Sequence, residues 1–460
     1  MDHSSIQSNS GRALGPAERG FALTRGQLDI WFSQEIGRAP DEWHNSGFAV
    51  IGGSVIPDLL SRAIRQVVAE AEPLRAAIIE VDGYVVQQAV DYPDLEVPFH
   101  DLRRCADPVR EATRRGLVLH RAPMPWAGPL FKFALFQTTS DEFYLFVCIH
   151  HVIVDGFGYA LLVNRIAAVY SALSTETPVA PSFFGSLESL VAGESAYEQS
   201  DDYREDLTYW NENLDSVVDY SFARAQGCHA SSATSVSVEL DRSVVDRAQQ
   251  LAQMVGVRRS SVITAACALL VHQRRGGPQV ILDFPVSRRT NPQLMTIPGM
   301  LSGTVPLVLT AVPDAEIGGF CQHVESQIRQ AIRHQRFPMH VLRNSNSRQG
   351  TDNSAGTVSV NFMPSVTLAP FGDAPSTVTI LSFAQGEHFG MVFTKDAGRL
   401  FLHTVGSGGP FGDSDVSHLA ARLQALLRVM AAEPGRRLGL IDLLDSREHE
   451  CLDVWGNRGV

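Results

Sequence analysis

Residues 129–173 carry the pattern that most constrains the fold of this chain. Two apolar runs, "FKFALFQ" and "FYLFVCI", are separated by the polar "TTSDE", which predicts a hairpin of two core strands. A pair of histidines ends the second run, and after "VDGFG" the apolar spacing becomes helical. The segment therefore predicts a strand, a turn and a helix in succession, with Asp155 and Gly156 in the turn.

The rest of the chain repeats this mixture of strands and helices. The run "PDLLSRAIRQVVAE" has apolar residues at helical spacing and a proline in its first turn, and "GYVVQQAV" predicts a strand. Beyond a stretch rich in Pro, Ser and Thr at 174–186, a similar order begins again with the strand "ATSVSVEL". Two halves of comparable size predict a pseudo-duplicated α+β architecture.

This organisation predicts three segments. Residues 1–20 are polar and predict a disordered leader, residues 21–190 an N-terminal lobe with the histidine pair, and residues 191–460 a C-terminal lobe. A chain of 460 residues is long enough for two such units. A site between two lobes is then the default expectation.

The composition narrows the classes of partner. The net charge of −12 argues against a nucleic-acid partner, and we interpret basic runs such as "RRCADPVREATRR" as solvated helix faces. Six scattered cysteines without a CxxC pair argue against a disulfide framework or a zinc knuckle. The N-terminus lacks the apolar region of a signal peptide, and no run approaches the roughly 18 apolar residues that span a bilayer. We therefore expect a cytoplasmic protein without a membrane partner.

The histidine pair allows three interpretations: a metal site, a catalytic base or a plain strand end. Neighbours on a strand face opposite sides, so His150 and His151 make a poor chelating pair, and we expect no metal. A general base needs a neutral imidazole held by hydrogen bonds. Asp155 could orient it or could pin the turn by pairing with a cation. Gly156 permits a left-handed or closely packed backbone that brings an amide near a substrate.

The chain offers no convincing covalent nucleophile. It contains no GxSxG, and Cys148 shares a strand face with His150 and is expected to be packed. A phosphate-binding GxxxxGK[ST] loop is also missing from the sequence, so the chain is not expected to activate substrates with ATP. These features favour direct transfer to an amine or hydroxyl without an acyl-enzyme.

The segment "HHVIVDG" resembles the HHxxxDG signature of nonribosomal peptide synthetase condensation domains, within the chloramphenicol acetyltransferase-like superfamily. The resemblance extends in the same order over nearly the whole chain. The segments that carry it are "LTRGQLDIWFSQ", "AEPLRAAIIE", "YREDLTYWNENL", "FPVSRRT", "IPGMLSGTVPLVL", "RHQRFP", "SVNFMP" and "LIDLLDSREHECLDVWGN".

The resemblance implies a V-shaped pair of transferase-like lobes with a central tunnel. It implies that carrier proteins present the acyl donor, and usually the acceptor, on phosphopantetheine arms, and that the chain itself binds no cofactor. His151 would point into the tunnel and assist attack on the donor thioester, as a base or as a positioning group, while His150 packs inward. Asp155, beside Gly156, would be structural through an ion pair with Arg289.

The resemblance also implies candidate tunnel residues, and two of them depart from the family pattern. Gly158 stands where a serine is frequent, and Gly303 where an asparagine is common, so we expect a roomier tunnel or a different acceptor. The histidines argue against a cyclisation enzyme, and "IPGMLSGTVPL" favours condensation over epimerisation. The candidate tunnel residues are Gly158, Met300, Ser302, Gly303, Asn361 and Met363.

The predicted function is the joining of a carrier-tethered aminoacyl or acyl donor to an amine or alcohol acceptor, small or carrier-bound, in natural-product (antibiotic) biosynthesis. The product would be an amide or an ester. A free-standing enzyme is favoured over an excised domain of a modular synthetase, because the chain starts at Met1 and ends cleanly. The alternatives are an acyltransferase of the same superfamily that uses acyl-coenzyme A, and a recruitment module without catalytic activity.

Overall fold

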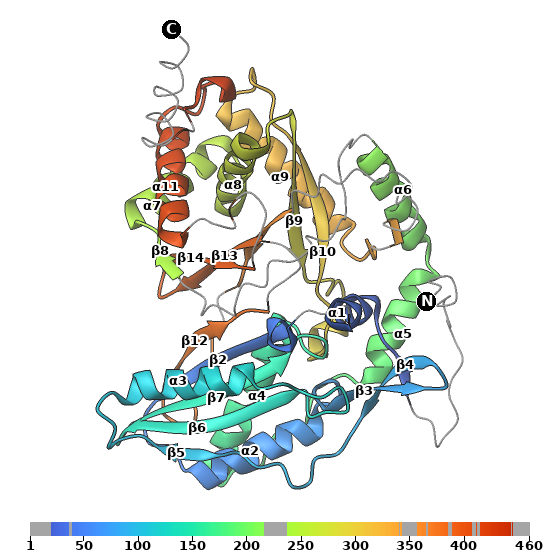
Figure 1. Ribbon diagram of the computed structural model, residues 1–460, viewed down its shortest axis with the longest axis vertical. Coiled ribbons are helices and arrows are strands. Elements are labelled where there is room, and N and C mark those ends of the chain that lie inside the picture. Colours follow the sequence, from blue (N-terminus) through green and yellow to red (C-terminus); the bar gives the residue numbers. More distant parts are fainter. Residues whose placement is uncertain are drawn as a thin grey trace. The chain divides into compact units, whose positions relative to one another are not determined.

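The computed structural model describes residues 20–35, 39–215, 237–339, 341–342, 357–364, 367–384, 389–406, 411, 415–442 and 444. The chain divides into two compact units, each drawn with its own sheet in Figure 1. Unit 1 comprises Met1–Leu207, Ser287–Gly303 and Val366–Gln385, and unit 2 comprises the remaining segments. Each unit combines helices with a mixed sheet, so the predicted α+β class is confirmed. Nearly all of the expected leader lies outside the described residues.

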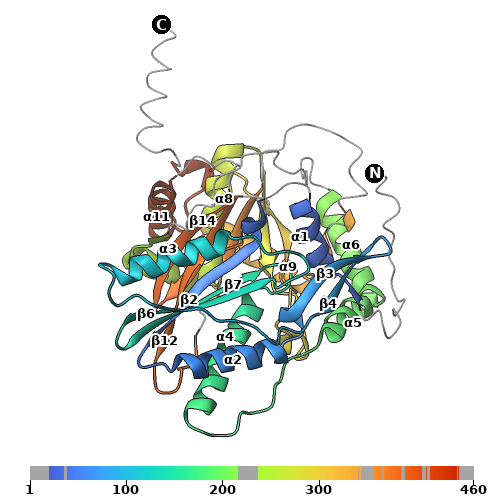
Figure 2. The ribbon, with the colours of Figure 1, turned by 60° about the horizontal axis from the view of Figure 1, so that its bottom comes forward.

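Unit 1 is built around a five-stranded sheet in the order β12-β2-β7-β6-β5. Helix α3 covers one face of this sheet, and α2 and α4 lie on the other (Figure 2). The elements are β2 (His44–Gly52), α2 (Pro57–Glu70), β5 (Phe99–Asp101), α3 (Pro108–Arg121), β6 (Phe131–Thr139), β7 (Glu142–His150), α4 (Gly156–Ser174) and β12 (Ser376–Ser382).

The predicted hairpin is confirmed as β6 and β7, which pair antiparallel. Both strands are buried on both faces because helices cover both sides of the sheet. The burial explains why these strands read as continuous apolar runs and not as alternating ones. Phe48, Phe136 and Phe146 form the aromatic centre beneath α3, with ring centroids 5.8–6.0 Å from Phe48.

Unit 1 also contains a three-stranded sheet, β1-β4-β3, and several short helices. These elements are β1 (Phe21–Ala22), α1 (Arg25–Glu35), η2 (Pro40–Trp43), η3 (Pro73–Arg75), β3 (Ala76–Val81), β4 (Tyr84–Ala89), α5 (Leu187–Glu198) and η4 (Leu294–Thr296). Helix α6 (Asp201–Asp215) contains the point at which the chain passes from unit 1 to unit 2.

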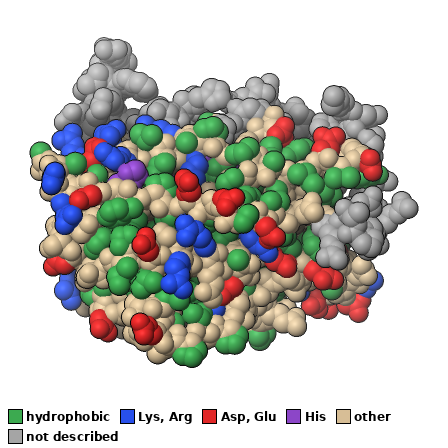
Figure 3. Space-filling model, turned by 90° about the horizontal axis from the view of Figure 1, so that it is seen from below, with side chains coloured by type: hydrophobic (Ala, Val, Ile, Leu, Met, Phe, Trp, Pro, Cys, Tyr) green, Lys and Arg blue, Asp and Glu red, His purple; other side chains and the backbone are tan. Residues whose placement is uncertain are grey.

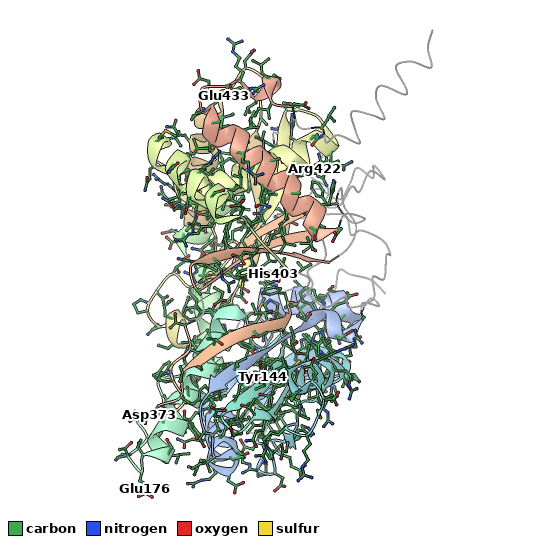
Figure 4. The ribbon with its side chains drawn as sticks, turned by 90° about the vertical axis from the view of Figure 1, so that its left-hand side faces the viewer. Tyr144, Glu176, Asp373, His403, Arg422 and Glu433 are labelled. Atoms are coloured by element: carbon green, nitrogen blue, oxygen red, sulfur yellow. The ribbon has the colours of Figure 1, made fainter. Side chains whose placement is uncertain are left out.

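Unit 2 is built around a six-stranded sheet in the order β10-β9-β11-β13-β14-β8. Strand β11 is parallel to β9 and β13, whereas β14 is antiparallel to β13 and β8. The elements are β8 (Ser237–Glu239), α7 (Arg242–Val255), α8 (Arg259–Arg275), β9 (Gln279–Val286), β10 (Gly303–Thr310), α9 (Ile317–Arg333), β11 (Val358–Phe362), β13 (Phe389–Asp396), β14 (Arg399–Val405), α11 (Val416–Ala432) and η6 (Leu438–Leu440). Figure 4 labels His403 on β14 and Arg422 on α11.

Two segments from the later part of the sequence, Ser287–Gly303 and Val366–Gln385, belong to unit 1, and the second contacts β2 and α4. Strand β12 pairs antiparallel with β2, and the Gly372 amide donates a 2.8 Å hydrogen bond to Ser171 Oγ on α4. Asp373 and Glu176 accordingly lie at the same end of unit 1 (Figure 4). The sequence predicted a single division at residue 190, whereas the compact units interleave along the chain.

Helix α4 departs from the expectation that no segment approaches the apolar length of a membrane span. It has 19 residues and a mean hydropathy of 1.2 over its apolar window. The helix is apolar because it packs against α2 in the core of unit 1, where its buried Arg165 pairs with Glu70 at 2.8 Å. The bent pair α7 and α8 also passes the same length and composition criterion.

The charged surface of unit 1 is mixed. Acidic and basic side chains alternate with apolar and neutral ones on the face drawn in Figure 3. In the basic stretch that begins at residue 103, Arg103 pairs with Asp101, and Arg114 and Arg115 both pair with Glu111. This pairing fits the interpretation of the stretch as a solvated helix face.

Candidate active site

His150 is the last residue of β7 and is fully buried. Its Nδ1 accepts a hydrogen bond from the Val152 amide at 3.1 Å, so Nε2 carries the proton and donates to Gln34 Oε1 at 2.9 Å. Burial, together with the charges of neighbouring groups, places the pKa of His150 well below its usual value. The ring is therefore neutral, and both of its nitrogens are engaged, which leaves no lone pair for a metal.

His151 follows the strand and lies in the turn, half-buried. Strand β7 ends at His150, so the strand alternation from which the sequence separated the two side chains does not apply to His151. The backbone amide of His151 donates to the Trp43 carbonyl at 2.7 Å, and Nδ1 of the His151 ring donates to the Val154 carbonyl at 3.1 Å. Nε2 therefore carries the lone pair, and no hydrogen bond to it is found among the described residues.

The environment of His151 keeps its imidazole neutral. Burial lowers the pKa of His151, and the nearby Asp155 charge and the Val154 carbonyl offset this effect only in part. A neutral ring with a free Nε2 is what a general base or a hydrogen-bond acceptor requires. The geometry thus fits both roles that the sequence left open.

Asp155 is the N-cap of α4, and both of its carboxylate oxygens are engaged. Oδ1 accepts from the Gly158 amide at 2.9 Å, while Oδ2 accepts from Arg289 Nη1 at 2.6 Å and from the amides of Leu301 and Ser302 at 3.1 and 2.9 Å. Burial alone raises the pKa of Asp155, but the Arg289 charge and these hydrogen bonds outweigh it, and the net pKa is lowered. The carboxylate anchors the turn and does not orient His151.

Arg289 is the partner that the resemblance implied, in preference to Arg288. Its side chain is 1% exposed, and its Nη2 donates to the carbonyls of Ile297 and Gly299 at 3.2 and 3.1 Å. The guanidinium also lies over the Phe157 ring, 4.6 Å from the centroid. The ion pair therefore fastens the segment 297–302 to the start of α4.

Gly156 begins α4 in the helical conformation and is not among the residues with positive φ. The left-handed backbone that the sequence allowed at this position is therefore not adopted. Gly158 is buried against the same loop: a Cβ there would lie 3.0 Å from the Pro298 carbonyl carbon and from Val154 Cγ1. Close packing accounts for Gly158, and the expected extra room for a substrate is not present there.

The extra space expected at Gly303 is not found either. A Cβ at this position would lie 2.3 Å from Arg288 Cζ, so the Arg288 side chain fills the volume that a side chain at 303 would need. Met300 is 6% exposed, and Ser302 is half-buried with its amide on Asp155. The remaining tunnel candidates, Asn361 and Met363, lie in unit 2, and their role and the tunnel itself stay predictions.

Sequence reasoning missed the groups that hold these side chains in place. Trp43 and Gln34 fix the two histidines, and only Gln34 falls in a segment that resembles a family motif. Arg288, with φ of +56°, directly precedes Arg289, and the charge of Glu194 interacts with that of Arg288. Burial raises the pKa of Glu194 to about 7, although the Arg25 amide donates to it at 3.0 Å. Arg288 stands beside Arg289 in the segment "FPVSRRT", whereas no sequence pattern distinguishes Glu194 from a surface residue.

Comparison with known proteins identifies the family. The model of the Condensation domain family matches residues 17–452. The chain is 25% identical over 434 residues to a dimodular nonribosomal peptide synthase of Bacillus subtilis, and 25% identical over 433 residues to an isonitrile lipopeptide synthase of Streptomyces coeruleorubidus. These alignments cover 94% and 91% of the chain but only 18% and 29% of the relatives.

Solved structures give the same result for the fold. The first condensation domain of the CDA synthetase is similar with a TM-score of 0.81 at 25% identity, covering 93% of this chain and all of that one. A mutant starter condensation domain of rhizomide synthetase, in complex with C8-CoA, has a TM-score of 0.78 at 26% identity, covering 93% of this chain and 98% of that one. The chloramphenicol acetyltransferase-like fold is thereby confirmed.

Condensation domains catalyse amide or ester formation by acyl transfer, and they act on substrates that carrier proteins hold through phosphopantetheine. The family match covers nearly the entire length and includes the HHxxxDG segment, in which His150 is buried, His151 is half-buried and Asp155 is anchored by Arg289. This chain belongs to the condensation domain family.

Proposed function

We propose that the chain transfers an acyl group from a carrier-bound phosphopantetheinyl thioester to an amine or alcohol acceptor in nonribosomal peptide or related natural-product biosynthesis. The observation that carries the mechanism is the state of His151. Its Nδ1 is committed to the Val154 carbonyl, which leaves the lone pair on Nε2 of a neutral ring.

The proposed reaction proceeds without an acyl-enzyme. The acceptor nitrogen or oxygen attacks the thioester carbonyl while its proton moves to Nε2 of His151. The carbon–sulfur bond then breaks, and the departing thiolate takes the proton from Nε2. A positioned base of this kind contributes about 10²–10⁴ in rate. The neutral state of His151 at pH 7 supports this role, since a protonated ring could not accept the proton.

A second candidate donor is acyl-coenzyme A, which carries the same phosphopantetheine arm. The observation that favours it is the solved starter condensation domain of rhizomide synthetase in complex with C8-CoA. The two donors share the thioester and differ in whether a carrier protein docks on the chain.

The test supplies octanoyl and aminoacyl groups on carrier proteins and on coenzyme A, each with a panel of amine and alcohol acceptors. We expect turnover from the carrier-bound thioesters, and a loss of about 10²–10⁴-fold in kcat in His151→Ala. His418→Ala, at an exposed histidine of α11, is the matched control and should retain activity.

The pH profile tests whether the neutral ring of His151 is the active form, which both a base and a hydrogen-bond acceptor require. Because the pKa of His151 is lowered, we expect the rate of the wild type to fall only as the pH drops below about 6.5. Full activity of His151→Ala would contradict the assignment, and turnover from coenzyme A thioesters alone would contradict the carrier-bound donor. Carrier binding without turnover in every arm would favour a recruitment module.

A further inference from the structure

Three buried side chains of unit 1 place metal-binding atoms close together outside the HHxxxDG motif. His44 at the start of β2, His120 in the last turn of α3 and Cys148 on β7 each offer one ligand atom, and these atoms lie within 4.8 Å of one another. The three residues are 0%, 2% and 0% exposed. They come from three different elements, so an ion held by them would join α3 to the sheet.

The hydrogen bonds around the two imidazoles orient them as metal ligands are oriented. His44 Nδ1 donates to the His120 carbonyl at 2.7 Å, and His120 Nδ1 lies 3.0 Å from Ser46 Oγ. Metal-binding histidines usually donate their second ring N–H to a carbonyl or similar acceptor in this way. The lone pair of His44 therefore resides on Nε2, which is buried and has no hydrogen-bond partner among the described residues.

An unpartnered buried nitrogen needs an explanation, because leaving such a group unsatisfied is unfavourable. Cys148 does not supply a hydrogen bond to it. An ion that accepts the lone pair of His44 Nε2 would satisfy this atom and would use the thiol beside it.

The charge around the cluster selects the kind of ion. Lys132 lies opposite Cys148 in the register of β6 and β7, and its ammonium donates to the carbonyls of Leu119 and Ala122. Burial raises the pKa of the Cys148 thiol to about 12, and the Lys132 charge opposes that rise. A monovalent ion bound to one thiolate and two neutral imidazoles forms a neutral group, whereas a dication beside the ammonium would leave buried positive charge.

We propose that His44, His120 and Cys148 bind one Cu(I) ion. Cu(I) is a soft ion that favours thiolate and imidazole ligands and accepts three of them. Ligand atoms around a common ion of this size lie roughly 3.3–3.8 Å apart, so the side chains need to close by no more than about 1–1.5 Å from separations within 4.8 Å. Binding follows Cu⁺ + Cys148–SH → Cu–S–Cys148 + H⁺, with one proton released per ion.

The site lies next to the first histidine of the motif. The His44 ring is 5.4 Å from the His150 ring, and the two residues are register partners on β2 and β7. A bound ion would therefore fix the layer of side chains on which His150 packs, without contacting His151.

The experiment titrates the full chain with Cu(I) from a competing chelator under anaerobic conditions, with Zn²⁺ in a parallel arm. We expect one Cu(I) per chain, one proton released, and a higher thermal midpoint of unfolding. Cys148→Ala and His44→Ala should lose this stoichiometric binding. Cys267→Ala, at another fully buried cysteine with a raised thiol pKa, is the matched control and should keep it.

Several results would overturn the proposal. They are no binding in the wild type, undiminished binding in Cys148→Ala, or stoichiometric binding of Zn²⁺ with none of Cu(I). X-ray absorption on the copper-loaded wild type tests the site even where a variant fails to fold. One sulfur and two nitrogen ligands are expected, and any other donor set contradicts the assignment.

Discussion

At the scale of single residues, the Asp155–Arg289 pair holds the turn that carries the motif. Asp155→Asn keeps the shape but leaves the buried guanidinium without a counter-charge, so we expect a loss of about 3–5 kcal/mol in the free energy of unfolding at pH 7. Because the pKa of Asp155 is lowered in the folded protein, the charge stabilises it fully above about pH 4, and the effect fades as the pH falls further. Urea denaturation of both proteins across this pH range measures the difference.

The exposed Asp101–Arg103 pair provides the control for this prediction. Asp101→Asn removes a carboxylate from a surface ion pair and should change stability little. If Asp155→Asn destabilises the protein no more than Asp101→Asn does, the role of Asp155 as an anchor is wrong.

Gly303 and Arg288 form a second coupled pair. An asparagine at 303 would overlap the Arg288 guanidinium, so Gly303→Asn should destabilise the protein by about 1–3 kcal/mol. Arg288→Gly removes the obstacle and suits the positive φ at this position, so the double variant should lose less than the sum of the two single ones. A double-mutant cycle by urea denaturation measures this coupling, and strict additivity would contradict it.

These residues also show what the sequence could and could not predict about the site. Resemblance was enough to name the histidines and the Asp155–Arg289 pair, because they lie within local motifs. Extra room at Gly158 and Gly303 is not found, because Pro298 and the Arg288 side chain fill that space, and the alternative of a different acceptor stays a prediction. A single sequence does not reveal which distant backbone or side chain approaches a glycine.

At the scale of elements, the prediction succeeded where the pattern was local and strong. The β6–β7 hairpin and helix α4 follow from continuous apolar runs and a change of period. The pairing of β12 with β2 joins residues more than three hundred positions apart, and no local pattern specifies it. The two histidines and the cysteine of the copper proposal, His44, His120 and Cys148, were missed in the same way, since β2, α3 and β7 bring them together only in the fold.

The contact between α1 and α5 carries a pH-dependent prediction. Glu194 on α5 has its pKa raised to about 7 by burial, so the folded state binds a proton that the unfolded state has lost between about pH 4.5 and 7. Stability should therefore decline as the pH rises through this range. Glu194→Gln should remove this decline and raise the free energy of unfolding by about 1–2 kcal/mol at pH 8. This gain is smaller than the whole pKa shift would give, because the Glu194 side chain is only half-buried and solvent screens its charge.

Thermal and urea unfolding at pH 4.5 and pH 8 check the Glu194 prediction. Glu198→Gln, on the same helix and paired with Arg25 at 2.8 Å, is the matched control and should show no such gain at pH 8. An equal effect of Glu194→Gln at both pH values would mean that its charge is not the cause.

At the scale of the whole molecule, the interleaved units constrain how the chain can be divided. Residues 1–207 contain the histidine pair and most of the sheet of unit 1, yet they lack β12 and Arg289. A fragment of residues 1–207 would expose the β2 edge and leave the buried Asp155 without its partner, a combination that costs several kcal/mol. We expect that this fragment alone does not unfold cooperatively and that the amides of β2 and β7 exchange fast in it.

Co-expression with residues 208–460 restores both missing segments and should recover exchange protection in β2 and β7. The two samples differ in whether residues 208–460, which include 287–303 and 366–385, are present. Hydrogen exchange in β2 and β7 can therefore be compared directly between them. Equal protection in the fragment alone would show that unit 1 does not depend on these segments. In that case the stability of unit 1 would lie within its continuous N-terminal part. The boundary near residue 190 that the sequence predicted would then describe the folding unit better than the interleaved division does.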